Sequence, residues 1–447
     1  MAKHQQYAEY KDSGVEWLDV IPMHWVMSKI KYVASFQVGW TPPTGNDSNF
    51  IGENIWANIS DLRGKVITDT VKRISDKAAK EASMDITPKG SLLYSFKLSV
   101  GSVSFAGCDM YTNEAIASFT SDSLLPLEYL YYVLPKFLIE NASTNIYGAR
   151  ILNQELIKNA IILKPTYEEA KTIANFLDYQ TAQIDTLIDK QQTLIQLLKE
   201  KRQAVISHAV TKGLNPDAPM KDSGVEWLGE VPEHWKVSPL KYIIKSARGA
   251  VKAGPFGSHL KSSDMKGKDV KVITQKNVIR NSVDIGDDFI SYEKYRELKA
   301  FTIFDKDILI TTRGTIGKTY VYDANKTAIL HPCLIRIQID ENKADTNLVS
   351  LIIQESGYAL EQILVNSNAT TIEVVYSENL INTVIAIPDN LSEQLEILEF
   401  IKAGKLELDG LIHKAEQAIQ LMQERRTALI SAAVTGKIDV RGWRASE

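Results

Sequence analysis

The sequence predicts a mixed α/β (α+β) protein built from two related halves, each an α/β globule followed by one long helix. Two observations lead to this prediction. Residues 11–18 read KDSGVEWL and recur letter for letter at 221–228, so the chain contains an internal repeat. Each half ends in a segment of about 40 residues with apolar side chains at helical spacing, and shorter strand-like runs precede it. We therefore expect a tandem duplication with pseudo-twofold symmetry.

A second repeated block closes each half. Residues 200–211 read EKRQAVISHAVT, and residues 424–435 read ERRTALISAAVT. The first pair of blocks is offset by 210 residues and the second pair by 224, so the second half has gained 14 residues between its blocks. The ends of the halves are thus alike, while the middles diverge.

These blocks divide the chain into seven segments. In order, they are an N-terminal arm (1–25), a first globule (26–165), a first long helix (166–211), a linker with the repeated arm (212–235), a second globule (236–388), a second long helix (389–435) and a tail (436–447).

The two long helices are predicted to pair. Neither contains an internal proline, and each would run about 60 Å at about 1.5 Å per residue. An apolar stripe of that length needs a partner, so we expect an antiparallel coiled coil within the chain, with Leu194 buried between the helices. Two independent helices in separate bundles are the alternative. Thr166 and Ser392, with Glu169 and Glu393 close behind, are predicted to cap the helix starts.

Several residues are predicted at the helix pair or at an interface with a partner. The tryptophans of the repeated arms are expected mainly in packing, with a partner contact as the alternative, and His24 and His234 are expected to be hydrogen-bonded structural residues. The predicted interface residues are Trp17, Trp227, Leu187, Leu194, Leu198, Ile412, Ile419 and Met422.

Each globule contains one clear hairpin pattern. Residues 307–318 place glycines between two apolar runs, and residues 90–103 occupy the equivalent place in the first half. Residues 124–140 are aromatic-rich and helical in pattern, with an interruption expected at Pro135.

The charge distribution favours nucleic acid as a ligand. The whole chain has a formal net charge of −4, but residues 236–280 hold 11 Lys and Arg against 2 Asp and Glu. Binding to phosphates needs local positive potential and not a positive total. The 2 cysteines and 7 histidines show no metal-binding spacing, so we expect reduced thiols, a cytoplasmic protein and no metal.

No catalytic motif is found. Residues 314–319 (GTIGKT) resemble a phosphate-binding loop, but Thr312 stands where the motif requires its first glycine, and a strand pattern follows. Residues 40–44 (WTPPT) echo the core of adenine methyltransferase sites without the flanking residues that hold a flipped base. We therefore expect no catalysis by this chain.

The two repeated blocks carry a family resemblance. The pattern KDSGVEWL-x3-P-x-HW before each globule and the ending E-[KR]-R-x-A-[VL]-I-S-x-A-V-T resemble the specificity subunits of type I restriction-modification enzymes, over essentially the whole chain. The resemblance implies that each globule is a target-recognition domain for one half of a bipartite, asymmetric DNA site.

The resemblance also implies the partners. The helices would space the two domains and dock two methyltransferase (modification) subunits, and restriction/translocase subunits would join that core. Methylation and cleavage, with S-adenosylmethionine, ATP and Mg, would belong to those partners, and this chain would bind no cofactor.

Candidate DNA contacts lie after strand-like runs and at turns. Asn and Gln suit adenine edges, and Arg and Lys suit guanine edges or phosphates, although a solvated surface role is the alternative for each one. The candidates are Asn58, Ser60, Arg63, Lys97, Asn145, Tyr147 and Arg150 in the first globule, and Lys252, Lys261, Gln275, Lys276, Asn277, Arg280, Arg313 and Lys318 in the second. Asn368, Thr370 and Thr371 would form the counterpart of the loop around Tyr147.

Two other functions are alternatives to DNA recognition. The chain could be a duplicated scaffold or inhibitor that grips protein partners, which the basic excess argues against. It could also be a duplicated DNA-modifying enzyme, which the missing cofactor motifs argue against.

Overall fold

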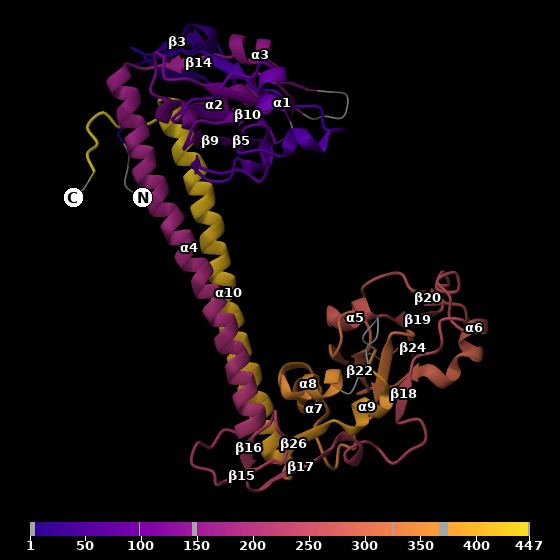
Figure 1. The fold of residues 1–447 in the computed structure, drawn as a ribbon. Helices are drawn as coiled ribbons and strands as arrows, with labels where there is room; N and C mark the ends of the chain where they lie inside the picture. The colour runs from indigo at the N-terminus through magenta and orange to yellow at the C-terminus, as the bar shows by residue number, and fades with distance from the viewer. Residues whose placement is uncertain (1–4, 98, 145–149, 324–325, 366–373, 446–447) are drawn as a thin grey trace. The chain divides into compact units, whose positions relative to one another are not determined.

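The computed structural model describes residues 5–97, 99–144, 150–323, 326–365 and 374–445 (Figure 1). The chain forms two compact units. Unit 1 comprises Met1–Gln191 with Gln417–Glu447, and unit 2 comprises Gln192–Glu416. Each long helix therefore contributes one part to each unit.

Unit 1 is built on a five-stranded sheet of order β4-β11-β8-β9-β6, antiparallel except for the β6–β9 pair. A three-stranded sheet, β10-β5-β7, and three two-stranded sheets, β1-β2, β3-β14 and β12-β13, complete it. The strands are β1 (Tyr10–Asp12), β2 (Val20–Pro22), β3 (Val26–Lys29), β4 (Phe36–Val38), β5 (Asn54–Ala57), β6 (Val66–Ile67), β7 (Arg73–Ile74), β8 (Leu92–Ser95), β9 (Val103–Ala106), β10 (Tyr111–Thr112), β11 (Ile116–Phe119), β12 (Ser143–Thr144), β13 (Arg150–Ile151) and β14 (Ile161–Lys164).

The helices of unit 1 pack around these sheets. They are η1 (Ile30–Tyr32), η2 (Asp47–Phe50), η3 (Ile59–Asp61), α1 (Asp76–Glu81), α2 (Leu127–Glu140), α3 (Gln154–Asn159) and the first part of α4 (Tyr167–Lys212), joined by the last part of α10 (Leu391–Val434).

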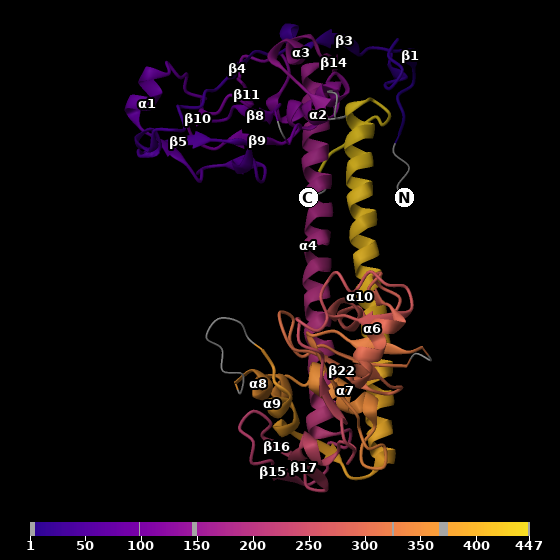
Figure 2. The same ribbon diagram turned by 90° about the vertical axis from the view of Figure 1, so that its right-hand side faces the viewer.

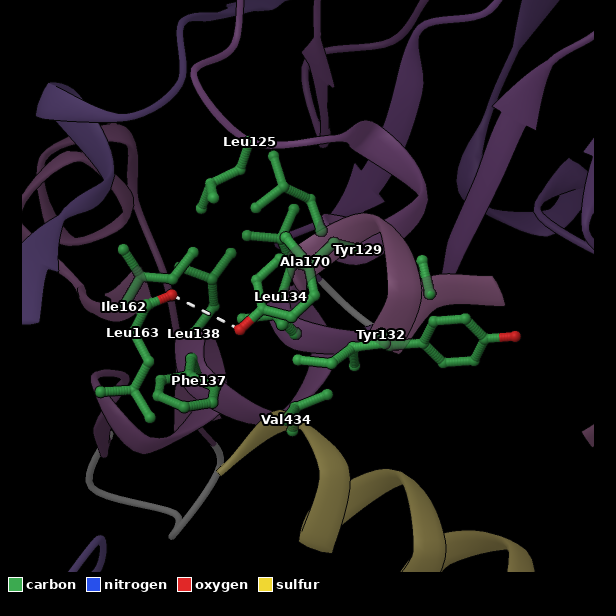
Figure 3. Packing of buried hydrophobic residues seen from close by; sticks show 14 of the residues in the cluster. Leu125, Tyr129, Tyr132, Leu134, Phe137, Leu138, Ile162, Leu163, Ala170 and Val434 are labelled. Atoms are coloured by element: carbon green, nitrogen blue, oxygen red, sulfur yellow. Dashed lines mark hydrogen bonds between the residues drawn. The ribbon is translucent and has the colours of Figure 1, made fainter. Parts of the chain in front are cut away.

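The core of unit 1 forms around α2. Tyr129 and Phe137 of α2 lie against Leu163 of β14, Ala170 of α4 and Val434 of α10, as Figure 3 shows, and the Tyr129 hydroxyl donates to the Leu163 carbonyl at 3.5 Å. The expected interruption is wrong, because α2 continues through Pro135 to Glu140. Burial of the surrounding aromatic side chains stabilises the helix despite the lost backbone hydrogen bond.

Unit 2 repeats this architecture with a four-stranded sheet, β18-β25-β22-β23, and a second one, β20-β19-β24-β21. Two-stranded sheets β15-β16 and β17-β26 complete it. The strands are β15 (Met220–Asp222), β16 (Glu230–Pro232), β17 (Trp235–Pro239), β18 (Val251–Ala253), β19 (Val270–Ile273), β20 (Phe289–Ile290), β21 (Thr302–Ile303), β22 (Ile308–Thr311), β23 (Thr319–Val321), β24 (Ala328–Leu330), β25 (Leu334–Ile337) and β26 (Val384–Pro388).

The helices of unit 2 close the fold. They are η4 (Leu240–Tyr242), α5 (Gln275–Ile279), α6 (Tyr292–Glu297), η5 (Lys299–Phe301), α7 (Thr346–Glu355), α8 (Tyr358–Val365) and α9 (Ser377–Asn382), together with the first part of α10 and the last part of α4. Among the residues described, no single helix is long and apolar enough to cross a membrane, although the bent pair α7–α8 would qualify by length and composition.

The two units share strand pairing as well as sequence blocks. The hairpin β8–β9 of unit 1 corresponds to β22–β23 of unit 2, which confirms both predicted hairpins. Strand β4 pairs with β11 as β18 pairs with β25, and the parallel pair β5–β10 corresponds to β19–β24. The duplication therefore extends through the globules, where the sequences diverge.

The predicted antiparallel helix pair is present in both units (Figures 1 and 2). In unit 1, Arg426 of α10 holds Asp185 of α4 with two hydrogen bonds, from Nε at 2.9 Å and from Nη2 at 3.2 Å. In unit 2, Arg202 of α4 pairs with Asp409 of α10. Both partners are offset by 224 residues between the two pairs, so one cross-helix ion pair occurs twice, once in each unit.

Exposure separates the predicted helix residues into two groups. The expectation that Leu194 is buried between the helices is wrong, since it is 43% exposed, and Leu187 is exposed to a similar degree. Ile412 is buried, and Leu198, Ile419 and Met422 are partly buried. The apolar stripe is wider than the seam that the helices bury, so part of it stays on the surface of each unit.

Candidate nucleic-acid interface

The repeated arms are fixed by a glutamate at the start of each long helix. In unit 1 the buried Glu169 carboxylate accepts hydrogen bonds from the Trp25 indole at 3.1 Å and the Tyr7 hydroxyl at 2.8 Å, and it lies 2.9 Å from His24 Nε2. Burial beside this carboxylate raises the pKa of the Tyr7 phenol. Thr166 caps the start of α4, as predicted, with its hydroxyl accepting from the Glu169 N–H at 3.3 Å.

The same arrangement recurs in unit 2. The Glu393 carboxylate accepts from the Trp235 indole at 2.9 Å and lies 2.9 Å from His234 Nε2. The cap at this helix start is Asn390, which accepts from the Ser392 N–H at 2.8 Å, so the prediction of Ser392 as the cap is wrong. The two histidines are hydrogen-bonded structural residues, as predicted. The sequence predicted that Glu169 and Glu393 take part in helix capping. In the structure their carboxylates instead bind the His-Trp pairs of the arms, which the sequence did not indicate.

The arm tryptophans Trp17 and Trp227 differ between the units. The Trp17 ring packs edge-on against Phe137 at 5.1 Å, so it is partly buried within unit 1. Trp227, at the equivalent position of unit 2, is exposed.

In each unit a short strand runs into a capped turn of helix, β5 into η3 in unit 1 and β19 into α5 in unit 2. In unit 2 the Asn277 side-chain oxygen accepts from the Thr274 N–H at 2.9 Å, and its Nδ2 donates to the Ile285 carbonyl at 2.8 Å. Asn277 is 0% exposed. Both hydrogen-bonding groups of its side chain bind the backbone inside unit 2. Asn277 therefore stabilises the turn and does not offer its amide at the surface.

The equivalent turn of unit 1 is η3. The Asn58 side chain accepts from the Ser60 N–H at 2.8 Å and the Ser60 hydroxyl at 2.6 Å, and Asp61 closes the capping box by accepting from the Asn58 N–H at 2.9 Å. Ser60 and Arg63 are exposed at this turn. The turn is therefore rigid, and Arg63 is its exposed cation.

Gln275, a second candidate in unit 2, holds the turn that carries the candidate Arg313. The Gln275 side chain donates from Nε2 to the Arg313 carbonyl at 2.8 Å and to the Thr315 carbonyl at 3.4 Å. This bond ties α5 to the turn of the β22–β23 hairpin. The exposed side chains of Lys276, Arg280 and Arg313 are thus presented by elements that are bound to each other.

Other candidates are held by local contacts. Lys252 Nζ lies 4.9 Å above the Phe301 ring, and Lys97 Nζ lies 5.9 Å from the Phe96 ring. Arg150 approaches Glu140 at 3.6 Å. Lys261 is exposed, and Lys318 lines a cavity of about 490 Å³ with Lys405 of α10. The remaining candidates lie outside the described residues: Asn145, Tyr147, Asn368, Thr370 and Thr371.

In unit 2 a buried ion pair joins Arg336 of β25 to Asp307, which directly precedes β22. Arg336 Nη1 lies 3.1 Å from Asp307, which also accepts from the Gln338 amide at 2.8 Å. Burial raises the pKa of the Asp307 carboxyl, and these donors oppose that rise. Burial also lowers the pKa of His331, whose Nδ1 accepts from the Cys333 N–H at 3.2 Å. In the part of the chain that the structure describes, no group of His, Cys, Asp and Glu could hold a metal ion.

Comparison with protein families gives one match, which occurs twice. The model of the type I restriction modification DNA specificity domain matches residues 22–197 and 232–420. The two matches cover most of the chain and correspond to its two halves.

Known relatives and structures extend the likeness over the full length. The type I restriction enzyme MjaIX specificity subunit of Methanocaldococcus jannaschii is 23% identical over 98% of this chain and 99% of its own. A chain from the structural work on complex assembly and conformational transition of the type I R-M system has a TM-score of 0.68 at 14% identity, over 93% of this chain and 98% of that one. The HsdS subunit from Thermoanaerobacter tengcongensis has a TM-score of 0.55 at 14% identity, over 94% and 98%. These two structures show the same fold.

Proposed function

Because this chain belongs to the family of type I restriction-modification DNA specificity proteins, we propose that each unit reads one half of a bipartite DNA sequence. The observation that carries the proposal is the duplicated family match, with one specificity domain in each half. The globules diverge in sequence on a shared set of strands, which fits two different half-sites and hence an asymmetric target. The scaffold or inhibitor alternative receives no support from the family match.

The exposed groups of unit 2 supply the chemistry for this reading. Lys276, Arg280 and Arg313 present cationic hydrogen-bond donors on elements joined through Gln275. Such donors suit phosphates and guanine edges, and rigid presentation reduces the entropy lost on binding. In unit 1 the equivalent turn presents Ser60 and Arg63.

The exposed part of the helix stripes supports a second element of the proposal. The exposed leucines of α4 and α10 include Leu187, Leu194 and Leu197 on α4 and Leu406, Leu411 and Leu421 on α10. Apolar side chains that remain exposed along paired helices are suited to contact with a protein partner. We assign them, with Trp227, to the docking of two methyltransferase subunits, which restriction subunits would join.

This assignment leaves the chemistry with the partners. The methyltransferase subunits would supply S-adenosylmethionine and methyl transfer, and the chain itself would direct them without catalysing. Since its ligand is the genome of its host, we expect the protein in the cytoplasm.

The test is a domain exchange read by methylation mapping. The full chain is produced with its methyltransferase subunits, and the methylated sequence is determined. Residues 236–388 are then replaced by the corresponding segment of a relative. We expect one half-site to change and the other to remain as it was. The unexchanged complex and an exchange of residues 26–165 serve as controls, and the latter should change only the opposite half-site.

Two outcomes would overturn the proposal. One is an exchange that alters both half-sites or neither. The other is methyl transfer by the isolated 447-residue chain without any partner subunit.

A further inference from the structure

Each unit has a large exposed aromatic side chain in the loop that follows the edge strand of its main sheet. Trp40, 55% exposed, directly follows Gly39, and Phe256, 78% exposed, follows Gly254 by two residues. Both glycines come immediately after the edge strand of the main sheet, β4 in unit 1 and β18 in unit 2. Single exposed hydrophobic residues are common, but an exposed ring in the corresponding loop of two diverged copies requires an explanation.

The glycines show that the two loops are equivalent. A Cβ on Gly39 would lie 1.8 Å from the carbonyl oxygen of Thr112, and a Cβ on Gly254 would lie 2.1 Å from that of His331. Thr112 ends β10, and His331 directly follows β24, the corresponding strand. Each loop is therefore pressed against the end of the corresponding strand in its unit, and only glycine permits that approach.

The loop of unit 2 is also fixed beyond the aromatic residue. The Phe256 carbonyl accepts from the His259 N–H at 2.8 Å, and Leu260 is buried in the core beside β19. The Phe256 ring meets the His259 ring edge-on at 6.0 Å. Because the backbone is anchored on both sides, the ring is presented outward by a defined turn.

A cationic side chain lies beside Phe256. Phe256 and Arg313 line one cavity of about 230 Å³, together with Tyr376. Arg313 belongs to the turn that Gln275 holds, and Lys261 follows in the same loop as Phe256. An aromatic ring beside a cation is suited to a polyanion that also offers apolar surfaces, which describes DNA and its bases.

The loop of unit 1 has matching features with different polar groups. The Trp40 N–H donates to the Thr112 carbonyl at 2.9 Å, and the Trp40 carbonyl accepts from the Trp56 indole at 3.0 Å. The Trp40 side chain lines a cavity of about 460 Å³ with Asn46 and Asn49. Both amides also hold the loop itself, because Asn46 Oδ1 accepts from the Ser48 N–H at 3.2 Å and Asn49 Nδ2 donates to the Pro43 carbonyl at 3.1 Å. The Trp40 ring is therefore the exposed contact surface of this loop.

We propose that Phe256 and Trp40 are the base-contacting aromatic residues of units 2 and 1, each directed at the half-site that its own unit reads. This rests on the proposed DNA-reading function. The rings carry no charge for phosphates, whereas base faces and the thymine methyl group offer apolar contact surfaces. Their contribution therefore falls on discrimination between sequences and not on general attraction to DNA.

The experiment measures DNA binding by the full chain in complex with its methyltransferase subunits. The probes are a duplex bearing the mapped target, two duplexes with one half-site scrambled, and one with both scrambled. We expect Phe256→Ala to weaken binding to the target about 10-fold, a typical loss for a base–aromatic contact. Binding to the fully scrambled duplex and the dependence of its affinity on salt should be unchanged. Phe256→Trp should keep most of the discrimination.

The half-site dependence gives a second readout. Phe256→Ala should reduce the affinity penalty for scrambling one half-site about 10-fold, and Trp40→Ala should do so for the other half-site. Tyr292→Ala in unit 2 and Tyr32→Ala in unit 1, which remove exposed rings elsewhere, should bind as wild type. Thymine-to-uracil replacement then reports a methyl contact, and 2-aminopurine fluorescence reports an unstacked base.

The outcomes separate this inference from the proposed function. If the unmodified complex does not distinguish target from scrambled duplex, the proposed function fails. If it does, and Phe256→Ala and Trp40→Ala behave like their tyrosine controls or weaken all duplexes equally, only the assignment of the aromatic residues is overturned.

Discussion

At the scale of single residues, polar and charged side chains near the capped turns at η3 and α5 divide into those that build the turn and those that face solvent. Asn277 satisfies backbone groups on both of its ends and is fully buried, whereas its neighbour Lys276 is exposed. Gln275 lies between these extremes, because its amide is committed to the hairpin turn. Residue type alone therefore does not identify a base contact.

This division predicts opposite effects for two adjacent substitutions. Asn277→Ala should lower the free energy of unfolding of the chain by about 2–3 kcal/mol, since several buried backbone groups lose their partners. Lys276→Ala should leave stability within about 0.5 kcal/mol and weaken DNA binding, with a smaller salt slope if it contacts phosphate. Denaturant unfolding and salt-dependent binding measure the two effects. Equal stability of both variants would contradict the structural role of Asn277.

The sequence predicts the fold correctly, but it identifies only part of the candidate DNA-contacting surface. Repeated blocks and strand patterns predict the duplication and the hairpins, because those features depend on local spacing. Burial of Asn277 depends on the loop at 282–285, and the equivalence of Trp40 and Phe256 depends on a glycine packed against a distant strand. Both relations join residues far apart in sequence or in separate copies whose letters differ, so no short pattern reveals them.

At the scale of elements, the long helices carry two apolar surfaces with different roles. The α4 residues Ile206, Ala209 and Val210 and the α10 residues Ile397 and Ile401 lie in the main buried cluster of unit 2, where the helix seam meets the strands and shorter helices of the core. Leu194 and its exposed neighbours lie outside that seam. A heptad-like stripe predicts pairing well, but it does not separate the face used within the chain from a face left for partners.

A matched pair of substitutions tests this separation. Ile401→Asp places a carboxylate in the seam, where Ile401 is 1% exposed, and should lower the free energy of unfolding by about 4 kcal/mol or more. Leu194→Asp meets water and should leave the melting temperature nearly unchanged while weakening association with the methyltransferase subunits. Thermal melts of the chain and sedimentation of the complex provide the readouts. If Leu194→Asp destabilises the isolated chain as strongly as Ile401→Asp, Leu194 belongs to the seam after all.

At the scale of the whole molecule, both long helices are continuous across the boundary between the units. The boundary falls after Gln191 in α4 and after Glu416 in α10. Each unit holds its own ion pair between the helices, Asp185–Arg426 in unit 1 and Arg202–Asp409 in unit 2. Residues added at the boundary would therefore lengthen the helical connection without changing the globule of either unit.

Insertion of four residues at both boundary points tests whether the helices set the distance between the two half-sites. Four residues add about 6 Å and slightly more than one turn, so the apolar stripes resume close to phase and both ion pairs can form. With DNA rising about 3.4 Å per base pair, we expect the methylated motif to keep both half-sites and to gain about two base pairs between them. Insertion of two residues at each point is the control. It rotates the stripes by about 200°, so it should impair assembly instead of shifting the spacing. Methylation at the original spacing by the four-residue variant would show that the helices do not set the distance between the half-sites.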